Sequence, residues 1–92
     1  MILLMTEIPV QCKSWNVYLV ECADGSLYTG ITTDLNRRLD EHNSGKGAKY
    51  TKTRRPVRLQ ASWSFPDRSS ASKEEARIKK LSRTDKLLLI TL

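Results

Sequence analysis

The stretch WNVYLVECADGSLYTGI, residues 15–31, decides the fold. Residues 17–20 and 27–31 within it are rich in β-branched, aromatic and aliphatic side chains, which favour strands. Between these two runs stands an Asp-Gly pair, a strong local hairpin signal because glycine adopts positive φ without steric cost. The stretch therefore predicts an antiparallel hairpin with one tyrosine in each strand, Tyr18 and Tyr28.

The length of the turn decides whether these two tyrosines share a face. A two-residue turn at Asp24-Gly25 would put Tyr18 and Tyr28 on opposite faces, since side chains alternate along a strand. A three-residue loop, residues 23–25, would instead place Tyr18 opposite Gly30 and both tyrosines on one face. Its glycine would then take the left-handed position of a bulge. We favour the three-residue loop.

A series of short motifs begins in this hairpin and continues along the chain. They are Asn16-Val17-Tyr18, Tyr28-Thr29-Gly30, a helix carrying Arg38 and His42, and Glu75 ahead of Ile78-Lys79. In this order they resemble the GIY-YIG nuclease superfamily, most closely its small single-domain bacterial branch, from residue 15 to the C-terminus. Asn16 replaces the glycine of the first name motif and Thr29 the isoleucine of the second. Neither position is expected to do chemistry in that family.

The resemblance implies both a fold and a reaction. The fold is a small α/β (α+β) domain over residues 15–92, a mainly antiparallel sheet of three strands flanked by helices, after an N-terminal extension of residues 1–14. The reaction is hydrolysis of DNA phosphodiester bonds by an endonuclease that depends on a divalent metal, in DNA repair or recombination. Glu75 would be catalytic by holding this metal, Mg²⁺ or Mn²⁺, and Arg38 would offset negative charge on the phosphoryl oxygens.

The resemblance also implies a role for the two tyrosines. Tyr18 would orient and deprotonate the attacking water, with Tyr28 hydrogen-bonded nearby. A free phenol titrates near pH ~10, so this role requires neighbouring cations to lower the pKa of Tyr18. Two other interpretations stay open. The chain could be a noncatalytic nucleic-acid-binding module with the same fold, or a nuclease that acts only inside a larger complex, where a protein partner supplies targeting.

Length and charge indicate the class of partner. At 92 residues the chain makes one domain. A net charge of +6 favours a polyanion, and DNA is the nucleic acid we expect. Cys12 and Cys22 make neither a metal site nor a secreted disulfide framework. No apolar run approaches the ~20 residues that span a bilayer, and the N-terminus lacks the basic start of a signal peptide. We therefore expect a cytoplasmic protein without membrane association.

The first predicted helix, residues 34–43, separates two adjacent arginines. Leu35 and Leu39 define its buried stripe. At 100° per residue, Arg38 lies about 60° from Leu35 and Arg37 about 160°, so Arg38 faces the sheet and Arg37 faces water. A charge on the apolar stripe needs a partner or a ligand. It is either a structural ion pair or a phosphate contact, and the alignment of Arg38 with the family's active-site arginine favours phosphate.

His42 is the only histidine, and it lies about 20° from Leu35 on the same stripe. A lone histidine on an apolar face is usually packed, with its ring nitrogens satisfied. Its position one turn after Arg38 is commonly histidine in the family, where it could relay protons. Both interpretations stay open, and His42 is included among the candidate catalytic residues.

Residues 46–58 form a basic segment without an acidic residue. The segment is either a solvated loop with a short helix or a surface for the phosphate backbone, with Gly45 and Gly47 permitting close approach. The uncompensated charge favours the second interpretation. Besides Arg58, the segment carries the five residues that we assign to nucleic-acid binding: Lys46, Lys49, Lys52, Arg54 and Arg55.

Alternation of apolar and polar side chains predicts a third strand over residues 57–65. Its buried face is expected to be Val57, Leu59, Ala61, Trp63 and Phe65.

A helix over residues 66–81 is predicted next, with Glu75 on its inward side. Glu74 is also near Ile78, so periodicity does not choose between these two acids. Ser72-x-x-Glu75 also fits a capping box, which requires a late helix start, whereas Asp67 or Ser69 would cap the helix earlier. The family spacing selects Glu75 as the metal ligand. A final helix capped by Thr84-Asp85 should close the core with residues 87–90.

Overall fold

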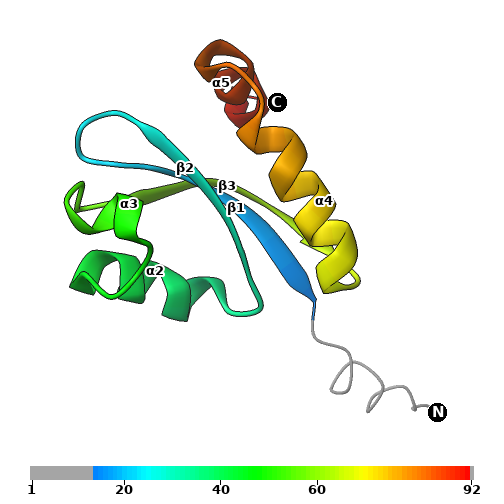
Figure 1. Ribbon diagram of the computed structural model, residues 1–92, viewed down its shortest axis with the longest axis horizontal. Coiled ribbons are helices and arrows are strands. Elements are labelled where there is room, and N and C mark those ends of the chain that lie inside the picture. The colour runs from blue at the N-terminus through cyan, green and yellow to red at the C-terminus, as the bar shows by residue number, and fades with distance from the viewer. Residues whose placement is uncertain (1–13, 92) are drawn as a thin grey trace.

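The computed structural model describes residues 14–91, so the N-terminal extension expected over residues 1–14 lies almost wholly outside it. Within residues 14–91, three strands form one antiparallel sheet in the order β2-β1-β3, and four helices flank it (Figure 1). This confirms the predicted fold class. In chain order the elements are β1 (Trp15–Glu21), β2 (Leu27–Thr32), α2 (Leu35–Ser44), α3 (Lys49–Lys52), β3 (Arg58–Phe65), α4 (Arg68–Lys79) and α5 (Arg83–Thr91).

The hairpin β1–β2 has the register of the three-residue loop. Tyr18 pairs with Gly30, and the amide of Cys22 donates to the carbonyl of Ser26 at 2.8 Å. Gly25 has φ 85°, the left-handed conformation expected of the bulge position. The prediction is confirmed, and both tyrosines therefore point to the same side of the sheet.

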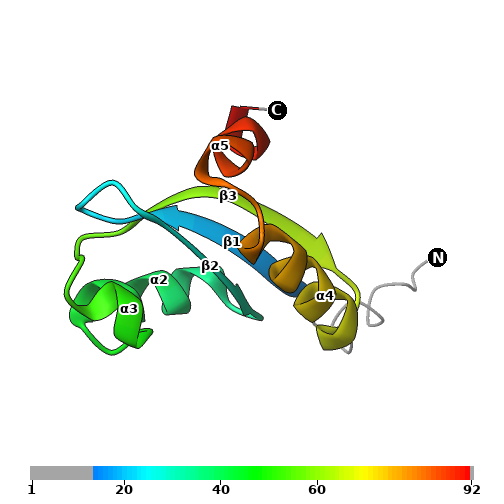
Figure 2. The ribbon, with the colours of Figure 1, turned by 45° about the horizontal axis from the view of Figure 1, so that its top comes forward.

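The two faces of the sheet are covered by different helices (Figures 1 and 2). Tyr18 and Val20 of β1 and the adjacent Cys22 form one core cluster with Val57. The partly buried Leu35 and Leu39 of α2 pack against this cluster. On the opposite face Val17 packs against Ala71 and Ile78 of α4, with Leu89 of α5 at the edge. The central strand β1 thus contributes alternate side chains to two small cores.

Aspartates begin the two long helices, and α2 ends at glycine. The carboxylate of Asp34 accepts from the amide of Arg37 at 3.1 Å, and that of Asp67 accepts from the amide of Ser70 at 2.7 Å. Gly45 ends α2 with φ 87°, a left-handed C-cap. Because α4 begins at Arg68, the capping-box interpretation of Ser72-x-x-Glu75 is wrong, and Glu75 is left free of a capping role.

The expectation that Leu59 lies on the buried face of β3 is wrong. Leu59 is 39% exposed. A bulge shifts the register between β1 and β3, so that Leu19 pairs with Ala61 but Val20 pairs with Leu59. Neighbouring residues on β1 point to opposite faces, so the bulge carries Leu59 away from the face of Ala61.

The start and the core contribution of the last helix also differ from the prediction. α5 is capped by Ser82, whose hydroxyl accepts from the amide of Asp85 at 3.1 Å. Leu87 and Leu88 are exposed, and Leu89 is the leucine that packs on the core. Within residues 14–91 there is no helix long and apolar enough to cross a membrane.

Candidate active site

Tyr18 crosses its neighbouring strand over Gly30. A Cβ atom on Gly30 would lie 2.6 Å from Cζ of Tyr18, far inside van der Waals contact, so only glycine lets the ring take this path. The ring is almost completely buried and is directed at helix α2. The cross-strand pairing that the turn length sets is therefore what aims the phenol at the helix.

Arg38 and His42 of α2 both contact the Tyr18 hydroxyl. Nε–H of Arg38 donates to Oη at 3.4 Å, and Oη lies 2.8 Å from Nε2 of His42. The two residues stand one turn apart on the helix, so their side chains reach the same strand residue. Three of the five predicted catalytic residues are thus brought into one hydrogen-bonded group.

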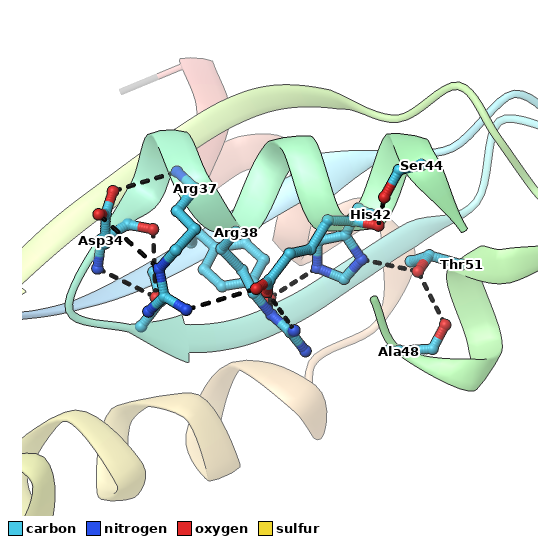
Figure 3. Close-up of polar contacts among 10 residues, drawn as sticks. Asp34, Arg37, Arg38, His42, Ser44, Ala48 and Thr51 are labelled. Atoms are coloured by element: carbon cyan, nitrogen blue, oxygen red, sulfur yellow. Dashed lines mark hydrogen bonds and ion pairs between the residues drawn. The ribbon is translucent and has the colours of Figure 1, made fainter. Parts of the chain in front are cut away.

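The other ring nitrogen of His42, Nδ1, is hydrogen-bonded to Thr51 of helix α3 (Figure 3). Nδ1 lies 2.7 Å from Oγ1 of Thr51, and that hydroxyl donates to the carbonyl of Ala48 at 3.0 Å. A hydroxyl has one hydrogen, so Oγ1 of Thr51 must accept from Nδ1–H. With the proton assigned to Nδ1 by this network, Nε2 is the nitrogen that can accept from the Tyr18 hydroxyl. His42 is fully buried with both nitrogens paired, as the packing interpretation expected.

Burial sets the protonation of this group. Desolvation raises the pKa of the Tyr18 phenol above its usual value, and the opposing hydrogen bond and charge of Arg38 do not offset it. Desolvation, followed by the charge of Arg38, lowers the pKa of His42. The condition for Tyr18 to act as a free tyrosinate, a pKa lowered by neighbouring cations, is therefore not met among the described residues. At neutral pH the phenol stays protonated and the imidazole stays neutral.

The adjacent arginines occupy the environments that the helical angles predict. The Arg38 side chain is 30% exposed and that of Arg37 is 62% exposed. Both contact Glu41: Nη1 of Arg38 lies 3.0 Å and Nη1 of Arg37 3.3 Å from its carboxylate. Arg38 alone of the two also reaches Tyr18, which confirms that it faces the sheet.

Tyr28 joins the group through its ring. Its centroid lies 6.4 Å from that of Tyr18 and 5.5 Å from that of His42. On its other side it stacks with Tyr50 of α3 at 5.8 Å, and the guanidinium of Arg54 lies 3.9 Å from the centre of the Tyr50 ring. An aromatic column therefore leads from the buried group to the basic segment.

The basic segment divides into exposed lysines and arginines that hold the protein's own backbone. Lys46, Lys49 and Lys52 are exposed. Nε of Arg54 pairs with Asp24 at 3.1 Å and its Nη1 donates to the carbonyl of Tyr50 at 2.7 Å.

The second arginine of the pair is held in a similar way. Arg55 donates to the carbonyls of Lys52 and Asn43 at 3.0 and 3.3 Å. Lys52 and Arg55 also line a shallow cavity of about 670 Å³ beside the end of α2. Gly47 permits a close approach of the backbone to His42, since a Cβ there would lie 2.8 Å from Cγ of the imidazole.

Glu75 stands apart from this group on α4. It is 21% exposed and pairs with Lys79 at 3.2 Å, while its neighbour Glu74 pairs with Arg77. Its charge is one of those that raise the pKa of Tyr18, which places it within electrostatic range of the phenol.

Glu75 suits a hard divalent cation. Mg²⁺ usually keeps several waters and takes one or two protein carboxylates together with substrate phosphate, so a single half-buried glutamate is a fitting ligand. Across residues 14–91 there is no cluster of three His, Cys, Asp or Glu side chains, so a metal cage made wholly of protein side chains does not occur in this part of the chain.

Sequence reasoning missed Thr51 and the role of Gly47. α3 is four residues long, too short for an apolar period to mark its inward side. The remaining signal is that Thr51 is an uncharged polar residue inside a run of lysines and arginines, and this is too weak to indicate a partner.

A family model described as the GIY-YIG catalytic domain matches residues 14–87. Among similar proteins, a UPF0213 protein of Halalkalibacterium halodurans is 54% identical over 76 residues, which cover 83% of this chain and 81% of the relative. A UPF0213 protein of Desulfotalea psychrophila is 58% identical over 78 residues, covering 84% of this chain and 71% of the relative.

Two solved structures are also similar. The solution NMR structure of a UPF0213 protein from Bacillus halodurans has a TM-score of 0.56 and 51% identity, covering 85% of this chain and 83% of that chain. That of a protein from E. faecalis has a TM-score of 0.60 and 47% identity, covering 86% and 84%.

Proposed function

The chain belongs to the GIY-YIG catalytic-domain family, and from this premise we propose that it is a divalent-metal-dependent endonuclease that hydrolyses DNA phosphodiester bonds in repair or recombination. The observation that carries the proposal is the hydrogen-bonded relay Arg38–Tyr18–His42–Thr51, whose hydrogen bonds all run in one direction when His42 carries its proton on Nδ1. Such a relay links a side chain that reaches solvent, Arg38, to a neutral imidazole that can accept a proton.

In this reaction Tyr18 transfers a proton instead of acting as a free tyrosinate. The Tyr18 hydrogen points to Nε2 of His42, and one lone pair of Oη accepts from Arg38. The second lone pair would accept from the attacking water. As the water gives its proton to Oη, Tyr18 passes its own proton to His42, so the products are a hydroxide, a neutral phenol and an imidazolium. The raised pKa of Tyr18 keeps the phenol protonated at the start of this step, and the lowered pKa of His42 keeps the imidazole neutral and able to accept a proton.

Arg38 is positioned to offset charge on the phosphate. Glu41 and Tyr18 take two of its donors and orient the guanidinium, while its 30% exposure leaves donors for a ligand. Glu75 would hold Mg²⁺ or Mn²⁺, which when bound supplies Lewis-acid stabilisation of the phosphoryl oxygens.

The exposed lysines of the basic segment would carry most of the phosphate-backbone contact. Replacing Lys46, Lys49 and Lys52 together by glutamine should weaken binding to unrelated DNA sequences and reduce the slope of log K against log salt by up to about 0.9 per lost contact. The matched control is Arg54→Gln, which breaks the pair with Asp24. This variant should lower the thermal midpoint, and its salt slope should change less than that of the triple lysine variant. An unchanged slope in the triple variant would leave the segment a solvated surface.

The decisive experiment measures cleavage of a panel of branched, nicked, single-stranded and duplex DNAs with Mg²⁺, Mn²⁺ or EDTA. The wild-type protein should cut at least one substrate when metal is present. It should cut none when EDTA is added, and Glu75→Ala should cut none under any of these conditions. If wild type binds the panel but cuts none, the residues serve packing, and the noncatalytic binding module becomes the better assignment. Addition of cell extract to the wild type and to Glu75→Ala tests whether a protein partner supplies targeting.

A further inference from the structure

Thr51 is the one buried polar residue that helix α3 sends toward the relay. It is fully buried, although it stands between exposed residues, Tyr50 and Lys52. Its hydroxyl has two partners in opposite roles: it donates to the carbonyl of Ala48 at 3.0 Å and lies 2.7 Å from Nδ1 of His42. The first bond uses the only hydrogen of the hydroxyl, so toward His42 it can act as an acceptor alone.

We propose that Thr51 is a positioning residue that holds His42 as the Nδ1–H tautomer and so directs the Tyr18 proton to Nε2. This role in the reaction rests on the proposed nuclease function, whereas the hold on the tautomer does not. A hydrogen bond to one ring nitrogen selects which nitrogen carries the proton. Thr51 therefore sets the direction of proton transfer along the relay. It acts through His42 and does not contact the substrate.

The other tautomer would reverse the relay. With the proton on Nε2, His42 would donate to Oη of Tyr18, and Oη would already accept from Arg38. Both lone pairs of the phenol oxygen would then be used, and no lone pair would remain for the proton of the attacking water. The Tyr18 hydrogen would also have no imidazole to receive it.

The backbone at Gly47 prevents the His42 ring from moving away from Thr51 and Tyr18. The chain at Gly47 passes against the ring so closely that a Cβ atom would lie 2.8 Å from both Cα and Cγ of His42. On the remaining sides the rings of Tyr18 and Tyr28 pack edge-on at centroid distances of 5.7 and 5.5 Å. The ring position is thus determined by packing, and its proton position by Thr51.

The test uses the fact that His42 is the only histidine, so imidazole ¹⁵N resonances need no assignment. Nitrogen chemical shifts should show the Nδ1–H tautomer in wild type and in Thr51→Ser, which keeps the hydroxyl. Thr51→Val removes it at nearly constant volume, and should move the population toward Nε2–H. Thr53→Val, at an exposed position two residues away, is the matched control and should match wild type. If Thr51→Val fails to fold, Thr51→Ala removes the same hydroxyl.

Cleavage supplies the second readout. Thr51→Val should cleave about 10²-fold more slowly, and Thr51→Ser should recover most of that loss. The acid limb of the pH–rate profile should move to lower pH in Thr51→Val, because the imidazolium loses an acceptor.

The same pH limb depends on the groups that face the ring: Arg38 and Glu41 from α2, and Tyr18 and Tyr28 from the strands. None of the four is altered in Thr51→Val. An unchanged tautomer in Thr51→Val overturns the proposal, as does a changed tautomer with unchanged cleavage. Absence of cleavage by wild type would refute the nuclease assignment instead, and is distinguishable because the ¹⁵N result would still report on the tautomer.

Discussion

Gly30→Ala tests whether the path of the Tyr18 ring is set by the residue opposite it. A Cβ at position 30 would lie 2.6 Å from Cζ and 3.0 Å from Cε2 of Tyr18, against the ~3.5–4.0 Å of a normal carbon contact. The ring must therefore move by about 1 Å. It has no free space in which to do so, because His42 lies 2.8 Å from the hydroxyl and both residues are buried.

The cost can be estimated from two contributions. Overpacking of this size costs about 1–3 kcal/mol, and loss of the Tyr18–His42 hydrogen bond adds ~1 kcal/mol. The sum, about 2–4 kcal/mol, should lower the thermal midpoint of a domain of this size by roughly 10–20 °C. That is less than the ~5–14 kcal/mol expected for the whole chain, so the variant should still fold. The cleavage rate should fall together with the stability, because the Tyr18–His42 hydrogen bond of the relay is lost.

The control is Gly25→Ala at the hairpin tip. Gly25 has φ 85° and open space around its Cβ position, so the substitution costs ~1–2 kcal/mol of backbone strain and leaves the site intact. Thermal midpoints and cleavage rates of both variants are measured in the wild-type background, and the thermal midpoints are measured again in a Tyr18→Leu background, which removes the overlapping atoms. Gly30→Ala should become nearly neutral there. An equal loss of stability in both backgrounds would refute the steric argument.

Three further predictions concern single positions. Arg38→Ala should lower the cleavage rate by ~10²–10³, as expected for a lost transition-state donor, whereas Arg37→Ala should leave the chemical step unchanged; equal effects would contradict the assigned helix faces. Glu75→Gln should abolish Mn²⁺ binding and cleavage while the thermal midpoint holds or rises slightly, and normal Mn²⁺ affinity would end the claim of catalysis. Thr29→Val should raise the free energy of unfolding by ~1 kcal/mol in denaturant titrations, because the buried Thr29 hydroxyl has no hydrogen-bond partner among the described residues. No gain would mean that the hydroxyl is solvated.

Local rules were sufficient for the hairpin and for the faces of α2. The register follows from the turn length and from strand alternation, and both are properties of fewer than twenty consecutive residues. The separation of Arg37 from Arg38 follows from the helical angle alone. In each case the side chain that matters lies within one element or its immediate neighbour.

Features that depend on pairing between distant segments were not predictable. Leu59 faces away from Ala61 because of a bulge that exists only where β3 meets β1, and no single-strand pattern contains it. Leu87 and Leu88 have the same apolar character as Leu89, yet only the contact of α5 with the core determines that Leu89 packs. Thr51 contacts His42 across a loop whose path depends on Gly45 and Gly47.

The largest difference between expectation and structure is the sign of the Tyr18 pKa shift, and it changes the chemistry. The base role that the family resemblance implies for Tyr18 requires neighbouring cations to lower the pKa of its phenol. In the fold, Arg38 is the cation that reaches Oη, and its effect is smaller than that of burial. A phenol that cannot ionise at neutral pH can still move a proton, provided that its hydrogen has an acceptor. His42 is that acceptor because Thr51 holds the other nitrogen protonated. Burial therefore excludes Tyr18 as an independent base and makes the orientation of His42 the feature on which proton transfer depends.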